Sequence, residues 1–331
     1  EWKALSGREV IAAFALAYEL ESLVSKALGT ELQVGFHPTA TVGTLAAAAG
    51  AARLLRLDRR RVTYALGIAG TSAAGIGEML GTMCKAFHPG KAAMHGVMAG
   101  LLAAKGLDSS EQVLEAKRGF GWALARKRDL DSAAVRLGSD WEILEGGFKP
   151  YACGVVAHPT IDAVIALRNQ YGLKASDVLS IHARTNPYVL VAMGKMSPRT
   201  GLEGKFSTVH CAAVALIDGT ARVAQYTDAR VNDPEVVRLR NKVTIETDET
   251  VRKDEAYLTV RLTDGRTLKH HVEHCLGSRD NPMSGADLEA KFRSLAEPVL
   301  GSPGAERVVD LVRHLDDLPD VGELPRTTVR P

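Results

Sequence analysis

Three alanine- and glycine-rich stretches follow one another near the start of the chain, and they constrain the fold more than any other feature. Apolar residues recur in them at helical spacing, which predicts helices over 6–27, 42–57 and 58–74. The first opens on a capping box, Ser6-Gly-Arg-Glu9; Thr39 or Thr41 caps the second, and Asp58 the third. Because small side chains let helices approach closely, we expect a tightly packed all-helical body.

The pattern changes near Trp141. A helix opens at His158-Pro159. Apolar and polar residues then alternate over 178–185, as in a half-buried strand, and 243–247, 256–263 and 267–273 are also expected to be strands. Helical spacing returns over 284–299 and 304–315, and a short helix over 111–117 and a loosely ordered tail over 319–331 are also expected. The sequence thus predicts a mostly α protein, in which an α+β domain (146–276) is inserted between two parts of a helical domain (1–145 and 277–331).

One basic stretch, Gly81 to Gly96, gathers several cations between glycines. They are Lys85, His88, Lys91 and His95. We expect Pro89-Gly90 to break the backbone here, so that the stretch forms a loop that opens an alanine-rich helix. Free N–H groups and the dipole at a helix N-terminus favour an anion, so a small molecule with several carboxylates suits this corner. A solvated basic turn is the alternative interpretation.

The composition and net charge of the chain argue against several classes of protein. A formal charge of +2 and an aromatic content of 5% disfavour a nucleic-acid binder. Four cysteines without CxxC spacing indicate reduced thiols in a cytoplasmic compartment. The longest apolar run, 42–52, is too short to cross a membrane. The chain opens on Glu1-Trp-Lys without a methionine, which is consistent with a fragment or a processed product.

Basic residues also recur next to glycine and proline at predicted loop–helix junctions. They are His37, Lys85, His88, Lys149 and His158. Such junctions place side chains at domain surfaces, and a cleft between two domains could gather them. Lysine and histidine can neutralise carboxylates and move a proton beside one. For each residue taken singly, capping or surface charge is the competing interpretation.

Three other motifs are weaker evidence of function. His270, His271 and His274 resemble a metal cluster, but neighbours on a strand point to opposite faces, so we do not expect a metal there. Gly75-Ile-Gly77 follows a helix rather than a strand, which argues against a dinucleotide site. Cys153 lies close to His158 in sequence, without a third orienting group, and is interpreted as a packing residue.

Several separate motifs, in order along nearly the whole chain, resemble the MmgE/PrpD family, which includes 2-methylcitrate dehydratase, cis-aconitate decarboxylase and iminodisuccinate epimerase. They are Gly35-Phe-His-Pro-Thr-Ala-Thr-Val-Gly-Thr-Leu-Ala-Ala-Ala48, Lys85-Ala-Phe-His-Pro-Gly-Lys-Ala-Ala-Met-His-Gly96, Lys149-Pro-Tyr-Ala-Cys153, His158-Pro-Thr-Ile-Asp162, Gly204-Lys-Phe-Ser207 and Asn281-Pro-Met-Ser-Gly-Ala-Asp-Leu288. The resemblance implies a helical domain, a smaller α+β lid domain, a homodimer, no metal or organic cofactor, and an active site between the two domains.

The same resemblance implies site residues. His37 and Lys85 match residues of the helical domain, and Lys149 matches a lysine at the hinge of the lid; these three are the expected catalytic residues. Tyr188 matches a lid tyrosine more loosely, as a substrate-binding residue. His88 and His158 belong to the same motifs and complete the expected substrate-binding set with Tyr188, although a structural role, or a place behind the residues that touch the substrate, is the favoured interpretation of both.

The family's chemistry implies removal of a proton α to a carboxylate of a small di- or tricarboxylate. We favour a dehydratase of the 2-methylcitrate type, with an epimerase second. The decarboxylase branch carries a histidine shortly after the hinge lysine, where this chain has Cys153-Gly154. The family's N-terminal Asp/Thr/His motif is also missing. An upstream segment or a second polypeptide would therefore complete the site, or the chain is a non-catalytic carboxylate-binding relative.

Overall fold

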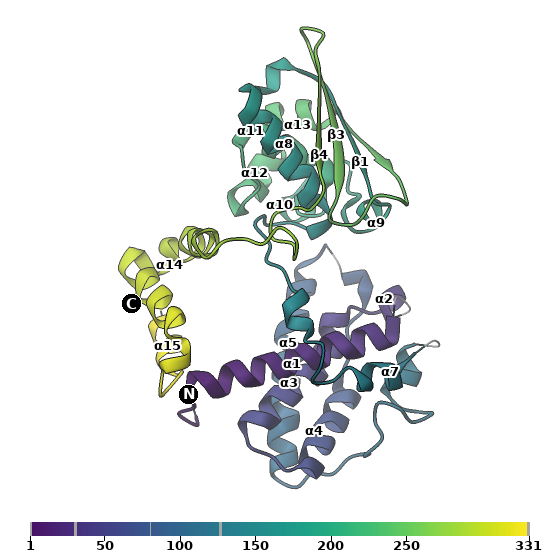
Figure 1. Ribbon diagram of the computed structural model, residues 1–331, viewed down its shortest axis with the longest axis vertical. Helices are drawn as coiled ribbons and strands as arrows, with labels where there is room; N and C mark the ends of the chain where they lie inside the picture. Colours follow the sequence, from purple (N-terminus) through teal and green to yellow (C-terminus); the bar gives the residue numbers. More distant parts are fainter. Residues whose placement is uncertain (1, 30–31, 80, 126–127, 330–331) are drawn as a thin grey trace. The chain divides into compact units, whose positions relative to one another are not determined.

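The computed structural model describes residues 2–29, 32–79, 81–125 and 128–329, and it forms two compact units. Unit 1 comprises Glu1–Glu145 with Phe292–Pro331, and unit 2 comprises Gly146–Lys291 (Figure 1). Most of the structure is helical and one small mixed sheet lies in unit 2, so the predicted fold class is confirmed at that level. Within the described residues, no helix combines the length and the apolar character needed to cross a membrane.

Unit 1 is built from α-helices and short 3₁₀ turns. Its α-helices are α1 (Gly7–Leu28), α2 (Leu32–Gly35), α3 (Pro38–Leu54), α4 (Arg59–Ser72), α5 (Met83–Ala104), α6 (Phe120–Leu124), α7 (Leu130–Val135), the greater part of α14 (Gly285–Arg313) and α15 (Glu323–Thr327). The predicted capping box of α1 is confirmed, since Ser6 Oγ accepts from the Glu9 N–H and the Glu9 carboxylate from the Ser6 N–H. Asp58 likewise caps α4.

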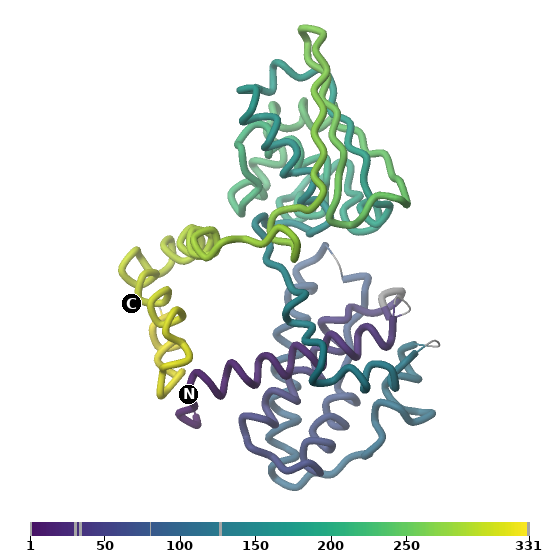
Figure 2. The backbone as a smooth tube through the Cα atoms, viewed as in Figure 1, coloured from purple at the N-terminus to yellow at the C-terminus, as the bar shows by residue number. Residues whose placement is uncertain are grey.

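Described segments near the two ends of the chain lie side by side within unit 1. The N–H of Gly7 donates to the carbonyl of Leu318 over 2.9 Å, and the N–H of Val321 donates to that of Leu5 over 2.8 Å. Figure 2 shows this as the yellow C-terminal segment beside the start of the purple helix. A Cβ added at Gly7 would lie 1.5 Å from the Leu315 carbonyl oxygen, so only glycine allows this approach.

Helix α3 lies at the centre of unit 1 and packs against α1, α4 and α5. Ala48 and Ala52 on α3, and Ala99 and Ala103 on α5, have no exposed surface. At Gly96 on α5 an added Cβ would lie 2.3 Å from the Cβ of Ala47 and 2.6 Å from the backbone nitrogen of Ala48. The predicted close approach of small-residue helices is therefore confirmed.

This close approach of α3 and α5 leads to a prediction about stability. Gly96→Ala should lower the free energy of unfolding by about 1–3 kcal/mol, because the added methyl group meets backbone atoms that cannot turn aside. Gly90→Ala is the matched control on the same helix. An added Cβ there meets nothing within 4 Å, so the exchange should stabilise by about 0.5–1 kcal/mol. Chemical denaturation of both variants measures this, and equal effects would contradict the packing described.

Several expected boundaries in unit 1 were wrong. Helix α3 begins at Pro38, so His37 rather than Thr39 or Thr41 is its N-cap residue. Helix α5 begins at Met83 and continues through Pro89-Gly90, because the loss of one backbone hydrogen bond is outweighed by the packing of the rest of the helix.

Other corrections concern short segments of unit 1. Residues 111–117 form turns instead of a helix, with Ser110 Oγ accepting from the Gln112 N–H. The tail expected to be loosely ordered contains α15, and the last two residues of that tail lie outside the described part of the chain. The two C-terminal helices were predicted correctly in substance, since Ser284 caps α14 and Gly301, with φ of 71°, interrupts it.

Unit 2 is a four-stranded sheet with helices on one face. The strands are β1 (Val178–Thr185), β2 (Val243–Thr247), β3 (Ala256–Leu262) and β4 (Thr267–Val272), in the order β2-β1-β3-β4. The helices are α8 (His158–Tyr171), α9 (Tyr188–Met193), α10 (Gly201–Gly204), α11 (Thr208–Asp218), α12 (Asp228–Val231) and α13 (Pro234–Arg240). The strand predictions and the helix from His158 are confirmed.

The sheet of unit 2 is mixed, since β1 pairs with β2 in parallel and with β3 in antiparallel orientation. Helices α8 and α11 cover one face, where Ile181, Leu258 and Val260 are buried (Figure 1). That unit 2 acts as a lid stays a prediction. The domain limits at 146 and 277 also stay predictions.

Candidate active site

His37 lies between α2 and α3 in unit 1, beside the backbone segment of Gly75 and Ile76. As the N-cap residue of α3, it precedes Pro38, whose missing N–H is not needed in the first turn of a helix. Its own N–H donates to the Gly75 carbonyl over 3.0 Å, and Phe36 bridges Ile76 in antiparallel fashion. The carbonyl of His37 accepts from the N–H of Ala40 over 2.9 Å. The backbone of this half-buried histidine is therefore held on both sides.

The side chain of His37 meets that of His88, which lies in the second turn of α5. The two Nδ1 atoms are 2.9 Å apart, and the ring centroids are 5.1 Å apart. His88 is 4% exposed, whereas His37 retains partial access to solvent. A hydrogen bond between two Nδ1 atoms requires one to carry hydrogen and the other a lone pair. The pair therefore shares one proton, and the two rings cannot both be imidazolium ions.

Lys85 lies one turn before His88 on the same helix and acts electrostatically on His37. Burial, the Lys85 charge and His88 together lower the pKa of His37 below its ordinary value. His37 is therefore neutral at neutral pH and can accept a proton. The half-buried Lys85 can supply a cation that binds a carboxylate. The neutral His37 can act as a base toward the carbon next to that carboxylate.

The other two cations of the basic stretch lie elsewhere. Lys91 Nζ donates to the carbonyl of Ala74 over 3.0 Å, which ties α5 to the segment that holds His37. His95 lies in the fourth turn of α5, and its Nδ1 is buried without a hydrogen-bond partner. The expectation that all four cations gather at a helix N-terminus was therefore wrong. Because the helix already starts at Met83, only Lys85 lies in its first turn.

Glu21 of α1 is a further titratable side chain of unit 1 that the sequence analysis did not single out. Burial raises the pKa of this half-buried carboxyl group. A Cβ added at Gly43 would lie 3.5 Å from Glu21 Oε1 and 3.8 Å from the Cβ of Ala92, one turn beyond His88 on α5. No sequence signal marks Glu21, because glutamates occur throughout amphipathic helices.

Lys149 and Tyr188 belong to unit 2. Lys149 is exposed, in a segment held by the hydrogen bond from the Phe148 N–H to the Gly277 carbonyl, at 2.9 Å. Tyr188 opens α9, and Lys253 Nζ lies 4.6 Å from the centroid of its ring. Their roles in a reaction stay predictions.

His158 is completely buried at the start of α8, with its ring edge-on to Tyr151. Tyr151 in turn donates to Asp162 Oδ1 over 2.5 Å, and the Leu276 N–H donates to the other oxygen of that carboxylate over 2.7 Å. These contacts anchor the segment that follows Lys149, so His158 has the surroundings of a structural residue. Substrate contact by His158 stays a prediction.

Cys153 lies in the same core and is 7% exposed. Interaction with the neighbouring Cys211 lowers the pKa of its thiol, although burial raises it. All four cysteines are free, and only Cys84 is exposed. The buried position agrees with the interpretation of Cys153 as a packing residue.

The histidines near β4 form no metal cluster. His271 pairs with Glu255 over 2.9 Å and His274 with Asp254 over 2.6 Å, while His270 lies opposite the buried Leu258. In the part of the chain that the structure describes, no group of three or more histidine, cysteine or acidic side chains has the arrangement of a metal site.

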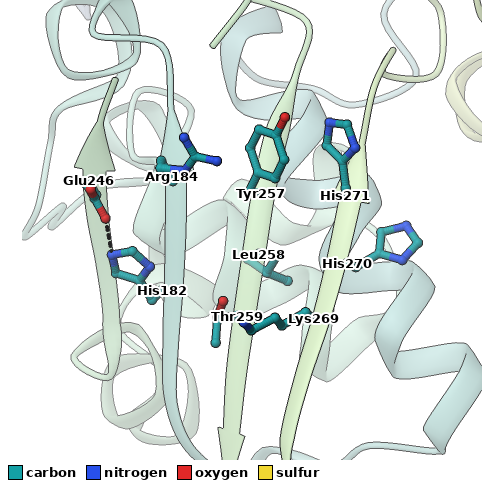
Figure 3. A pocket seen from close by; sticks show the side chains of 9 residues that line it. All are labelled: His182, Arg184, Glu246, Tyr257, Leu258, Thr259, Lys269, His270 and His271. Atoms are coloured by element: carbon teal, nitrogen blue, oxygen red, sulfur yellow. Dashed lines mark ion pairs between the residues drawn. The ribbon is translucent and has the colours of Figure 1, made fainter. Parts of the chain in front are cut away.

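A hollow of about 470 Å³ lies on the open face of the sheet (Figure 3). Its lining is His182, Arg184, Glu246, Tyr257, Leu258, Thr259, Lys269, His270 and His271. Arg184 lies over the ring of Tyr257 at 4.1 Å, and His271 stacks on that ring at 4.1 Å. Two of its basic side chains already have acidic partners, His182 at 3.0 Å from Glu246 and Arg184 at 2.5 Å from Asp248. It is therefore a weaker candidate for an anionic substrate than the His37 site.

Comparison with known families gives a match for nearly the whole chain. Residues 1–133 match the MmgE/PrpD N-terminal domain, and residues 151–317 match the MmgE/PrpD C-terminal domain. The chain belongs to the MmgE/PrpD family. The resemblance inferred from the motifs around His37, Lys85 and Lys149 is thereby confirmed.

Curated members of the MmgE/PrpD family resemble the chain at modest identity. The cis-aconitate decarboxylase of Homo sapiens is 29% identical over 96% of this chain and 68% of its own length. The enzyme of the same name from Mus musculus is 30% identical over 97% and 68%. That from Aspergillus terreus is 29% identical over 97% and 71%. The chain therefore spans about two thirds of the length of each of these relatives.

Proposed function

We propose that the protein is a lyase that acts on a small di- or tricarboxylate, and that proton transfer takes place at His37. The hydrogen-bonded pair of His37 and His88, with Lys85 one turn away, supports this proposal more than any other observation. A neutral imidazole can take the proton from the carbon α to a carboxylate. The Lys85 ammonium group can stabilise the negative charge that then develops on that carboxylate.

Three reactions fit this arrangement. In dehydration, which the motifs led us to favour, the α C–H bond breaks, the electron pair forms the alkene, and the β-hydroxyl leaves as water after protonation. In decarboxylation, which the names of the relatives support, a C–C bond breaks, CO₂ leaves, and the resulting carbanion takes a proton from imidazolium or ammonium. The resemblance implies that neither reaction needs a metal or an organic cofactor. Return of the proton to the opposite face would give epimerisation.

A substrate panel separates these reactions. The protein is incubated with 2-methylcitrate, cis-aconitate and iminodisuccinate, and proton NMR follows the loss of water, the loss of CO₂ and the inversion of the stereocentre. We expect turnover of one of them. Binding of all three without turnover would favour the non-catalytic carboxylate-binding alternative and contradict the proposal.

Lys149 offers a further test from unit 2. If it takes part in the reaction, as the resemblance implies, Lys149→Met lowers kcat/KM by about 100-fold, on the scale of a lost electrostatic contact to a developing charge. Lys174→Met is the control, because it removes an exposed lysine of the same unit, in the segment between α8 and β1. Unchanged kinetics of the Lys149 variant would remove that residue from the proposed site.

A further inference from the structure

The His37–His88 contact leaves two arrangements of the shared proton. Either His88 donates Nδ1–H and His37 keeps its hydrogen on Nε2, or His37 donates Nδ1–H and its Nε2 has a free lone pair. Only the second makes His37 a base through the ring nitrogen that lies away from His88. Whether His88 Nδ1 carries a hydrogen thus decides whether the half-exposed ring of His37 can act as a base through Nε2.

His88 is held more firmly than His37. It is 4% exposed, and a Cβ added at Gly75 would lie 3.5 Å from its Cε1 and 2.1 Å from the Cβ of Ala40. The absence of a side chain at Gly75 lets this backbone segment pass between α3 and α5. The same residue accepts the hydrogen bond from the His37 N–H. Lys91 fixes the preceding carbonyl, that of Ala74.

One backbone segment thus holds the main chain of His37 and packs against the ring of His88. A rotation of the His88 ring would move it against that segment and against the helix that carries it. His37, at the N-cap of α3, has the freer side chain of the two. Packing therefore fixes the orientation of the His88 ring, and His37 is the member of the pair with access to solvent.

We propose that His88 is a positioning residue: its Nδ1 accepts the Nδ1–H of His37 and so fixes the tautomer in which His37 Nε2 carries the free lone pair. The role in turnover rests on the function proposed above, but the tautomer itself is a property of the free protein. His88 does not touch the substrate in this account. After His37 takes a proton on Nε2, the His88 lone pair stabilises the imidazolium through the same hydrogen bond.

The test is nitrogen-15 NMR of the full chain labelled at histidine, without substrate, because protonated and unprotonated ring nitrogens differ widely in chemical shift. We expect His37 to carry hydrogen on Nδ1 alone. His88→Leu removes the acceptor, and His37 should then revert to a mixture that favours Nε2–H. His88→Asn should restore the Nδ1–H form, since the asparagine Oδ1 takes the place of Nδ1. His95→Leu, on the same helix, is the control and should change nothing at His37.

Kinetics give the second readout. His88→Leu should lower kcat by about 10-fold or more with little change in KM, as expected for a misplaced tautomer, and His88→Asn should recover most of it. A His37 that carries hydrogen on Nε2 in the unsubstituted protein, or keeps its tautomer in His88→Leu, would overturn the proposal. If the tautomers behave as expected but no carboxylate is turned over, the proposed function is wrong and the positioning of His37 by His88 stands.

Discussion

His37→Asn should lower kcat by about 100- to 10,000-fold, the range that general acid–base catalysis supplies, while the fold stays intact. Asparagine is a good N-cap residue, so α3 keeps its start, and its side-chain amide can still reach His88 Nδ1. What the substitution removes is Nε2, the nitrogen assigned to proton transfer. The loss should therefore appear in kcat, with KM changed by no more than a few-fold.

Steady-state kinetics on the substrate found in the panel, together with a thermal melt, measures this. His314→Asn is a suitable control, because His314 is an exposed histidine of unit 1 after the end of α14. It should retain full activity. A His37→Asn protein that melts normally and turns over at the unsubstituted rate would remove His37 from the chemistry.

Lys85→Met should produce the second large effect, a loss of about 100-fold or more in kcat/KM, because the developing carboxylate charge then lacks its cation. The same variant should raise the pKa of His37, since the Lys85 charge is one of the causes that lower it. The acid limb of the pH–rate profile reports that pKa, because protonated His37 cannot act as a base. Activity is lost as the pH falls through the pKa of His37, so in Lys85→Met the loss should begin at a higher pH.

Stability should respond in the opposite sense to activity in this variant. A cation in the first turn of a helix is disfavoured by the helix dipole, by about 0.3–1 kcal/mol. Lys85→Met should therefore melt at the same temperature or slightly above. Lys105→Met is the control at the end of α5, since Lys105 is exposed and is not among the charges that act on His37. A Lys85 variant with an unchanged acid limb would contradict the electrostatic coupling described.

Local signals predicted much of the fold. The capping box of α1, the Asp58 cap of α4 and the alternation along β1 each depend on a few neighbouring residues, and all three were predicted correctly. Helix α5 was misjudged because Pro89-Gly90 is a strong local break signal. The contacts of Gly96 and the residues after it with α3, which outweigh that signal, are not visible in the local sequence.

The sequence identified individual residues of the candidate site, but it did not predict which of them contact one another. His37, Lys85 and His88 were each marked by a glycine–proline junction or a family motif. The hydrogen bond between His37 and His88 joins residues 51 positions apart, and it depends on how α3, α5 and the Gly75 segment pack. Glu21 escaped notice because its burial, and not its identity, makes it unusual.

Proton exchange between solvent and substrate tests the central claim most directly. The full chain is incubated in D₂O with the carboxylate that it turns over, and mass spectrometry follows deuterium at the carbon where the proton is removed or added. We predict that the unsubstituted protein catalyses this incorporation and that His37→Asn loses it while still binding the carboxylate, as shown by calorimetry. Incorporation at an unchanged rate in His37→Asn would contradict the account.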